Sequence, residues 1–162
     1  MHYIFAGGTG ILPFMDLLDY LLKKALFTEF NEILSEEDVD QINIYKENYV
    51  GSFNNNFKLM LFASFANDEE FIGSEIISKL YECVKEKKYN WFDMKIRISA
   101  KDTKFQNLPL TSSYFDHRFL KKNVMKEESL KKIYVCGPPA MNKKMHEELM
   151  TYGIDENVIH FV

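Results

Sequence analysis

The chain has 162 residues, with 20 basic and 24 acidic side chains and a formal net charge of −4. This length fits one domain with a real core, and the lysines are too scattered to indicate a nucleic-acid partner. The apolar stretches are shorter than a membrane span and no basic-then-apolar leader follows Met1, so we expect a protein of the cytoplasm or of the cytoplasmic face of a membrane. Cys83 and Cys136 are expected to be free thiols, because one lies in a helical pattern and the other ends a strand.

The first predicted elements are a strand, a glycine turn and a helix. The apolar run Tyr3–Ala6 breaks into Gly7, Gly8 and Gly10, which let the main chain turn sharply and let a ligand approach closely. The following helix would point free N–H groups at an anion such as pyrophosphate. The turn lacks the third small residue of a G-x-G-x-x-G fingerprint, where Pro13 stands, and the lysine of a P-loop. From these residues alone, a purely structural turn is the alternative.

The middle of the chain predicts two further strands and two helices. Residues 14–26 have the spacing of an amphipathic helix, and the acidic, irregular residues 28–56 are interpreted as a surface insertion. The apolar run 57–66 is typical of a buried parallel strand. Asn67 and Glu70 then predict the capped start of the next helix. Residues 94–98 alternate apolar and charged side chains, which predicts a strand near the sheet edge.

The last third of the chain completes the alternation. Residues 99–131 form a long polar loop with a short helix predicted over 114–122, and such loops often serve a site. A strand at 132–136 turns at Gly137 into a helix whose expected C-cap is Gly153, and a strand at 158–162 follows. We therefore expect one α/β domain over residues 1–162, with a parallel five-stranded sheet between two helical layers.

Three segments together resemble one family. Residues 6–14 (AGGTGILPF) are similar to the pyrophosphate turn of the ferredoxin-NADP reductase superfamily, Gly-Gly-(Thr/Ile)-Gly-(Ile/Val)-x-Pro. Residues 134–141 (YVCGPPAM) resemble its Cys-Gly-Pro-Pro-x-Met signature, and residues 65–72 (FANDEEFI) resemble the segment after the second strand in its cytochrome reductases. With the segments in the right order, the chain resembles the C-terminal NAD(P)-binding domain of this superfamily, as in cytochrome reductases and NADPH oxidases.

The resemblance implies an oxidoreductase domain that delivers hydride from NADH to FAD. The flavin would be held by a separate barrel domain, and single electrons would pass on to haem, iron or oxygen. The residues that mark such a barrel are not found in this sequence, so we expect the flavin-binding domain upstream in a longer parent chain or in a separate subunit. This domain alone would then bind nucleotide without reducing a flavin.

By the same resemblance, the cofactor-binding residues lie at the ends of four strands: Gly7, Gly8, Thr9, Gly10, Ile11, Pro13, Ala66, Asn67, Asp68, Gly137, Pro138, Pro139, Met141 and Phe161. The resemblance also places Cys136, the candidate catalytic residue, beside the reactive carbon of the nicotinamide. A thiol there would help to set the geometry of hydride transfer without acting as a nucleophile. The alternatives are a small buried hydrophobic residue for Cys136 and an ordinary strand aromatic for Phe161.

The residues expected to contact the adenosine half of the dinucleotide predict the choice between NADH and NADPH. The run from Asn67 to Glu70 is acidic, and a carboxylate such as Asp68 accepts from a ribose 2′-hydroxyl but repels a 2′-phosphate, so NADH is expected over NADPH. Arg97 and Lys101 would favour NADPH instead. No two histidines have metal-ligand spacing, so no metal site is predicted. Two other classes stay open, a non-catalytic nucleotide-binding or scaffold module and a methyltransferase, against which the turn at 136–139 argues.

Overall fold

In the computed structural model, the described residues are 1–27, 57–124 and 130–162, so the insertion expected at 28–56 lies outside them. The strands are β1 (His2–Gly7), β2 (Leu59–Phe65), β3 (Phe92–Ile98), β4 (Lys132–Cys136) and β5 (Ile159–Phe161). The helices are the 3₁₀ turn η1 (Gly8–Phe14), α1 (Met15–Phe27), α3 (Ser74–Glu86), α4 (His117–Asn123), α5 (Pro139–Thr151) and the 3₁₀ turn η4 (Glu156–Val158). Strands and helices alternate along the chain as predicted.

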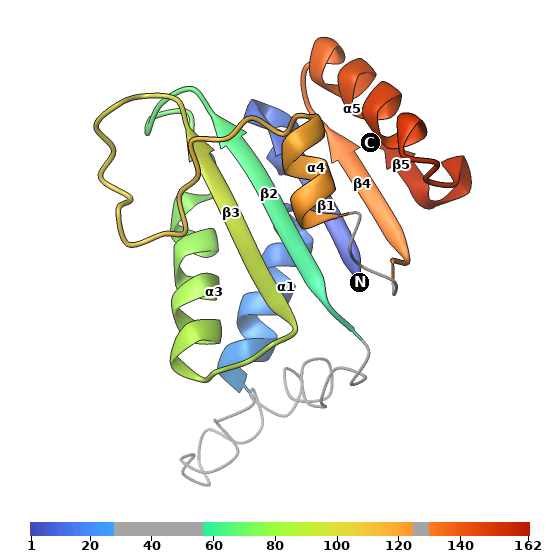
Figure 1. The fold of residues 1–162 in the computed structure, drawn as a ribbon. Helices are drawn as coiled ribbons and strands as arrows, with labels where there is room; N and C mark the ends of the chain where they lie inside the picture. Colours follow the sequence, from blue (N-terminus) through green and yellow to red (C-terminus); the bar gives the residue numbers. More distant parts are fainter. Residues whose placement is uncertain (28–56, 125–129) are drawn as a thin grey trace, which may run out of the picture.

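The sheet is parallel throughout, and its strand order is β3-β2-β1-β4-β5. This confirms the predicted α/β fold with a parallel five-stranded sheet. Because β1 lies between β2 and β4, the chain first builds the sheet on one side of β1 and then crosses back to build the other side (Figure 1). The carboxyl ends of β1 and β4 therefore flank the point where the winding direction reverses.

Helices cover both faces of the sheet, and each face has its own apolar core. On one face Ile4 and Leu61 pack with α1 and α3. On the other, Phe5 and Phe62, the next residues of the same strands, pack with α4 and α5. Strands that are buried on both faces are apolar at nearly every position, which explains the continuous apolar run of β2.

The strand β3 lies at the sheet edge, as its alternating sequence predicts. The polar segment that follows it runs back along this edge. The Ile96 N–H donates to the Pro109 carbonyl (3.1 Å), and the Thr111 N–H donates to the Ile96 carbonyl (2.8 Å). This short pairing covers part of the open edge and leads residues 112–116 across to α4.

The helix predicted to begin at Asn67 begins only at Ser74. Asn67 Oδ1 does accept a hydrogen bond from the N–H three residues later, at 2.9 Å, but this bond closes a turn. Phe71 is then buried in the core, and Gly73 takes a left-handed φ of 74° at the N-cap position. The predicted helix start was wrong because the burial of Phe71 and the glycine conformation outweigh the local capping signal.

Other local predictions are confirmed. The short helix expected over 114–122 is α4, and α5 begins directly after the turn at Gly137 and Pro138. Gly153 follows the end of α5 with a φ of 73°, and its N–H donates to the Met150 carbonyl at 2.9 Å. Both cysteines are free thiols.

Candidate functional site

The two glycine-containing turns meet at the carboxyl edge of the sheet. β1 ends at Gly7 and β4 ends at Cys136, and the parallel register sets Ala6 beside Cys136. One turn leads into η1 and the other, through Gly137, into α5. Open α/β sheets bind their ligands in the crevice at this reversal of the winding direction.

The two turns pack closely at three of the glycines, and at Gly10 the contact is with backbone. A Cβ on Gly10 would lie 2.1 Å from the Cys136 carbonyl oxygen and 2.8 Å from the Gly137 nitrogen. A Cβ on Gly7 would lie 2.6 Å from Met141 Sδ, and one on Gly137 would lie 2.8 Å from Met141 Cε. The first turn, the Cys136–Gly137 peptide and Met141 therefore form one packed unit, which we call the paired-turn unit.

Gly8 lies in a different environment from these three glycines. Its φ is +55°, a left-handed conformation that favours glycine, and a Cβ built on it meets nothing within 4 Å. The neighbouring Thr9 is exposed, and no side chain caps the start of η1. Uncapped backbone N–H groups beside open space can bind an anion.

The remaining residues of this turn differ in their exposure. Ile11 is fully buried in the core that α1 covers, so its side chain is a packing residue and only its main chain can face a ligand. Pro13 lies inside η1 and is exposed. Pro138 and Pro139, which start α5, are exposed as well.

Cys136 and Phe161 lie on opposite faces of the sheet. Cys136 is half-buried and packs against the core on the α1 and α3 face. Phe161 pairs in register with Val135, and its ring makes an edge contact with His146 of α5, with centroids 5.7 Å apart. The structure therefore brings Cys136 into the paired-turn unit and does not set the Phe161 side chain beside it.

The residues predicted at the end of β2 are tied to the segment after β3. The Ala66 carbonyl accepts from the Ala100 N–H at 3.0 Å. The Asp68 carboxylate accepts from the Lys104 N–H at 2.8 Å and from the Thr103 hydroxyl at 2.5 Å. The Lys104 N–H, followed by the Thr103 hydroxyl, lowers the pKa of the Asp68 carboxyl below its ordinary value of 3.8. Asp68 is thus ionised and anchors this segment.

A cavity of about 300 Å³ adjoins the paired-turn unit. It lies between the ends of β2 and β3 and the first half of α5, and it shares Met141 with that unit. Two of its residues are cationic, Arg97 and Lys144, and an aromatic ring, Tyr114, forms part of its wall.

Arg97 and Tyr114 are held together at this cavity. The Arg97 guanidinium carbon lies 3.8 Å from the centroid of the Tyr114 ring, and the guanidinium donates to Ser64 Oγ (3.4 Å) and Ser99 Oγ (2.5 Å). Tyr114 stays 66% exposed. The sequence indicates Arg97 as a cation near the site but does not reveal Ser64, Tyr114 or Lys144, because their meeting depends on the path of residues 111–116. An isolated aromatic in a polar loop is the only signal.

Within residues 1–27, 57–124 and 130–162, no three His, Cys, Asp or Glu side chains are grouped as metal ligands would be. In the same part of the chain, no helix is long and apolar enough to cross a bilayer.

The parallel sheet, the paired turns at its reversal point and the open backbone at Gly8 define a dinucleotide-binding α/β domain. Residues 4–147 match the family described as the oxidoreductase NAD-binding domain. The chain belongs to this family.

Solved structures of the ferredoxin-NADP reductase and cytochrome b5 reductase type have the same fold. The cytochrome b5 reductase domain of Ulva prolifera nitrate reductase is 13% identical, with a TM-score of 0.60 over 99% of this chain and 49% of that chain. The CS-b5R domains of human Ncb5or, in the NAD⁺ form, are 18% identical, with a TM-score of 0.60 over 99% of this chain and 36% of that chain. Flavohemoglobin from Malassezia yamatoensis, with bound FAD and heme, is 13% identical, with a TM-score of 0.56 over 99% of this chain and 30% of that chain.

The chain therefore spans about half or less of each of these proteins. No curated protein sequence matches it significantly.

Proposed function

We propose that this domain binds a nicotinamide dinucleotide and presents it to a flavin that another domain holds. The observation that carries the proposal is the paired-turn unit with Gly8 open beside it. The bound dinucleotide would supply a hydride, which FAD on the other domain would accept before single electrons pass onward. The contribution of this chain is binding and orientation.

The proposal assigns one part of the ligand to each part of the site. The pyrophosphate is assigned to the backbone N–H groups from Gly8 to Gly10 and to the Thr9 hydroxyl. Cys136, whose carbonyl contacts this turn, would lie against the nicotinamide and hold its orientation, where small displacements cost rate. The adenosine is assigned to the 300 Å³ cavity, because the exposed Tyr114 ring offers a stacking surface for a base.

NADH is the proposed donor, supported by the acidic run from Asp68 to Glu70. NADPH is a second candidate, because two observations favour it. The Asp68 oxygens already accept from Thr103 and Lys104, and the cavity wall carries Arg97 and Lys144. A 2′-phosphate would gain charge-assisted hydrogen bonds from these two cations.

The proposed partner is a flavin-binding domain, in the same parent chain or in a separate subunit. The proposed final acceptor is haem, iron or oxygen. Support comes from the structural relatives, since the flavohemoglobin contains FAD and heme and the Ulva domain belongs to a nitrate reductase.

Calorimetric titration with NAD⁺, NADH, NADP⁺ and NADPH tests the binding proposal. Gly8→Val should abolish binding by blocking the approach of the pyrophosphate to the backbone. Gly153→Val is the matched control, because Gly153 also has a positive φ and open space around its Cβ but lies beyond the far end of α5. Binding that is lost only in Gly8→Val supports the site, whereas equal losses in both variants, or no binding by the wild type, contradict it.

The same titration compares the two donors. Tighter binding of NADH supports the first candidate, and tighter binding of NADPH supports the second. Adding a flavin domain then separates a reductase from a non-catalytic scaffold, because only the reductase bleaches the flavin absorbance when the preferred nucleotide is mixed in.

A further inference from the structure

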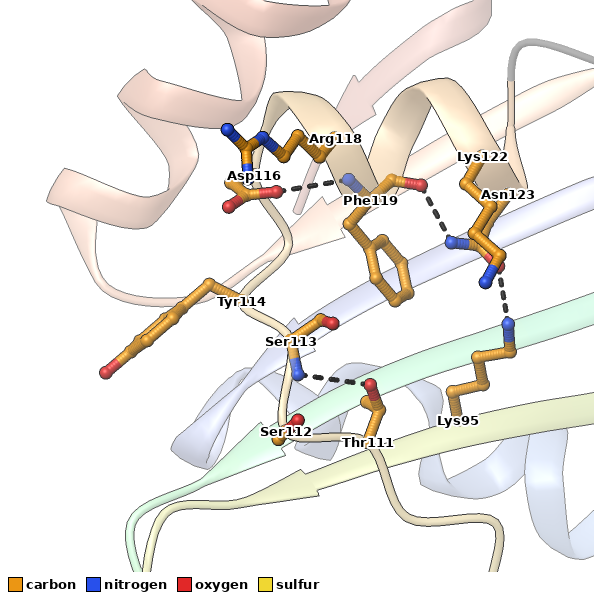
Figure 2. Close-up of a pocket in the computed structure, with 10 residues that line it drawn as sticks. All are labelled: Lys95, Thr111, Ser112, Ser113, Tyr114, Asp116, Arg118, Phe119, Lys122 and Asn123. Atoms are coloured by element: carbon orange, nitrogen blue, oxygen red, sulfur yellow. Dashed lines mark hydrogen bonds between the residues drawn. The ribbon is translucent and has the colours of Figure 1, made fainter.

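A second cavity, of about 400 Å³, lies on the α4 side of β3. Its walls come from β3, from residues 111–116 and from α4, as Figure 2 shows. Tyr114 borders both this cavity and the one assigned to adenosine, and it separates them. None of the residues assigned to the dinucleotide by the sequence lines this second cavity.

The lining is cationic. Among the described residues that line it, three are cationic, Lys95, Arg118 and Lys122, and one is a carboxylate, Asp116. The Asp116 Oδ1 accepts from the Phe119 N–H at 3.1 Å and so caps α4. Within the described part of the chain, none of the three cations forms an ion pair with a carboxylate. The cavity therefore has an excess of positive charge that an anion would neutralise.

Asp93 does not line the cavity. It lies two residues before Lys95 on the same face of β3, but its carboxylate accepts from the Met94 N–H at 2.9 Å. The nearest acidic neighbour along the strand is therefore turned to its own backbone.

Lys95 is held in place by neutral groups. Its Nζ donates to Asn123 Oδ1 at 2.5 Å and lies 5.8 Å from the centroid of the Phe119 ring. Asn123 Nδ2 donates to the Phe119 carbonyl at 2.7 Å, which aims the amide oxygen at the lysine, as Figure 2 shows. An ammonium has three donor hydrogens. A half-buried charge whose partners among the described residues are neutral gains most from an added anion.

Hydroxyl groups line the wall beside Lys95, where residues 111–113 leave the edge of β3. Thr111 Oγ1 accepts from the Ser113 N–H at 3.2 Å, which leaves the Thr111 O–H to donate elsewhere. The side chains of Ser112 and Ser113 border the cavity too and are exposed. Cations and hydroxyl donors around one cavity are the groups that surround a bound phosphate.

We propose that this cavity binds a phosphate monoester of a small polar molecule. Lys95, Lys122 and Arg118 neutralise the phosphate, and the hydroxyls of residues 111–113 donate to its oxygens. The volume of about 400 Å³ falls in the range of small-molecule sites, so the phosphate carries a further group, and the polar walls select a hydrophilic one such as a sugar. Apart from Tyr114, which borders both cavities, the site uses none of the residues that line the cavity assigned to adenosine, and the proposal does not depend on the proposed function.

The test is calorimetric titration of the 162-residue chain with inorganic phosphate and with glucose 6-phosphate, and glucose serves as the uncharged control. Lys95→Met keeps the aliphatic stem over Phe119 and removes the charge, and Lys122→Met removes an exposed charge without touching the core. Each should weaken the binding of glucose 6-phosphate about ten-fold or more, as expected for the loss of a charge-assisted hydrogen bond. Lys121→Met is the matched control, because Lys121 is the neighbouring exposed lysine of α4 but does not line the cavity.

Two results would overturn the proposal. One is the absence of saturable binding of either phosphate to the wild type. The other is equal weakening in Lys121→Met and Lys122→Met, which would mean diffuse attraction to a basic helix. Gly8→Val tells the two sites apart, because it should leave glucose 6-phosphate binding unchanged. If this variant lost glucose 6-phosphate binding, the phosphate would bind at the paired turns, and the proposal would be overturned.

Discussion

Gly10→Ala is the sharpest test of how the two turns pack. The new Cβ would lie 2.1 Å from the Cys136 carbonyl oxygen, whereas carbon and oxygen atoms in contact lie about 3.3 Å apart. One of the two backbones must therefore move by roughly 1 Å, and a backbone yields less easily than a flexible side chain. Overpacking costs about 1–3 kcal/mol, and we expect about 3 kcal/mol, the upper end of that range. For a domain of this size, the melting temperature should fall by roughly 6–12 °C.

Urea unfolding followed by circular dichroism measures this loss against two controls. Gly8→Ala and Gly153→Ala each place a side chain at a positive φ, but with open space around it, so each should cost only about 1–2 kcal/mol of left-handed strain. The expected order of destabilisation is Gly10→Ala first, then the two controls together. A Gly10→Ala variant as stable as Gly153→Ala would show that the turns are not in contact and would refute the close packing of the paired-turn unit.

Two further predictions concern residues near the proposed adenosine site, Asp68 and Arg97. The folded-state pKa of Asp68 is lowered below 3.8 by the Lys104 N–H and the Thr103 hydroxyl, so its ionised form stabilises the fold above the unfolded-state pKa, and this contribution is lost as the pH falls through the folded value. The urea midpoint of the wild type should therefore exceed that of Asp68→Asn at neutral pH, and the difference should close as the pH falls below the folded-state pKa of Asp68; a constant difference would exclude the carboxylate charge as its cause. Arg97→Met removes the guanidinium beside Tyr114 and should weaken NADPH binding about ten-fold more than NADH binding; an unchanged ratio in the titration would show that Arg97 does not meet the 2′-phosphate.

The parts of the site that could be predicted from the sequence are those with a local backbone requirement. The turn at residues 7–10 and the turn at Gly137 and Pro138 need glycine or proline at particular positions, and few other backbone conformations need these residue types. The parallel sheet is equally visible, since strands that are buried on both faces, such as β2, become continuous apolar runs. These features depend on short-range geometry and on burial, both of which the sequence records directly.

The parts that could not be predicted depend on long-range packing. Asn67 makes the predicted local hydrogen bond, yet α3 begins later because Phe71 is buried against Phe65, with ring centroids 4.5 Å apart. Tyr114 meets Arg97 only because residues 112–116 cross from β3 to α4. Phe161 faces α5 because of the register of β5, and a shift of one residue would place it on the opposite face.

The glycines also separate what the fold needs from what a ligand needs. Gly10 is required by backbone contacts inside the protein, and a Cβ on Gly7 or Gly137 would press on the flexible end of Met141, so a protein that kept this fold and bound nothing would still need Gly10. The resemblance of the turn to a nucleotide site is therefore partly a consequence of packing. Gly8 is different, because no described residue other than its chain neighbours lies within 4 Å of its missing Cβ. Within the described part of the chain, only its positive φ favours glycine there. The binding proposal therefore depends chiefly on Gly8, and the comparison of Gly8 with Gly153 tests it more directly than any substitution at the other three positions.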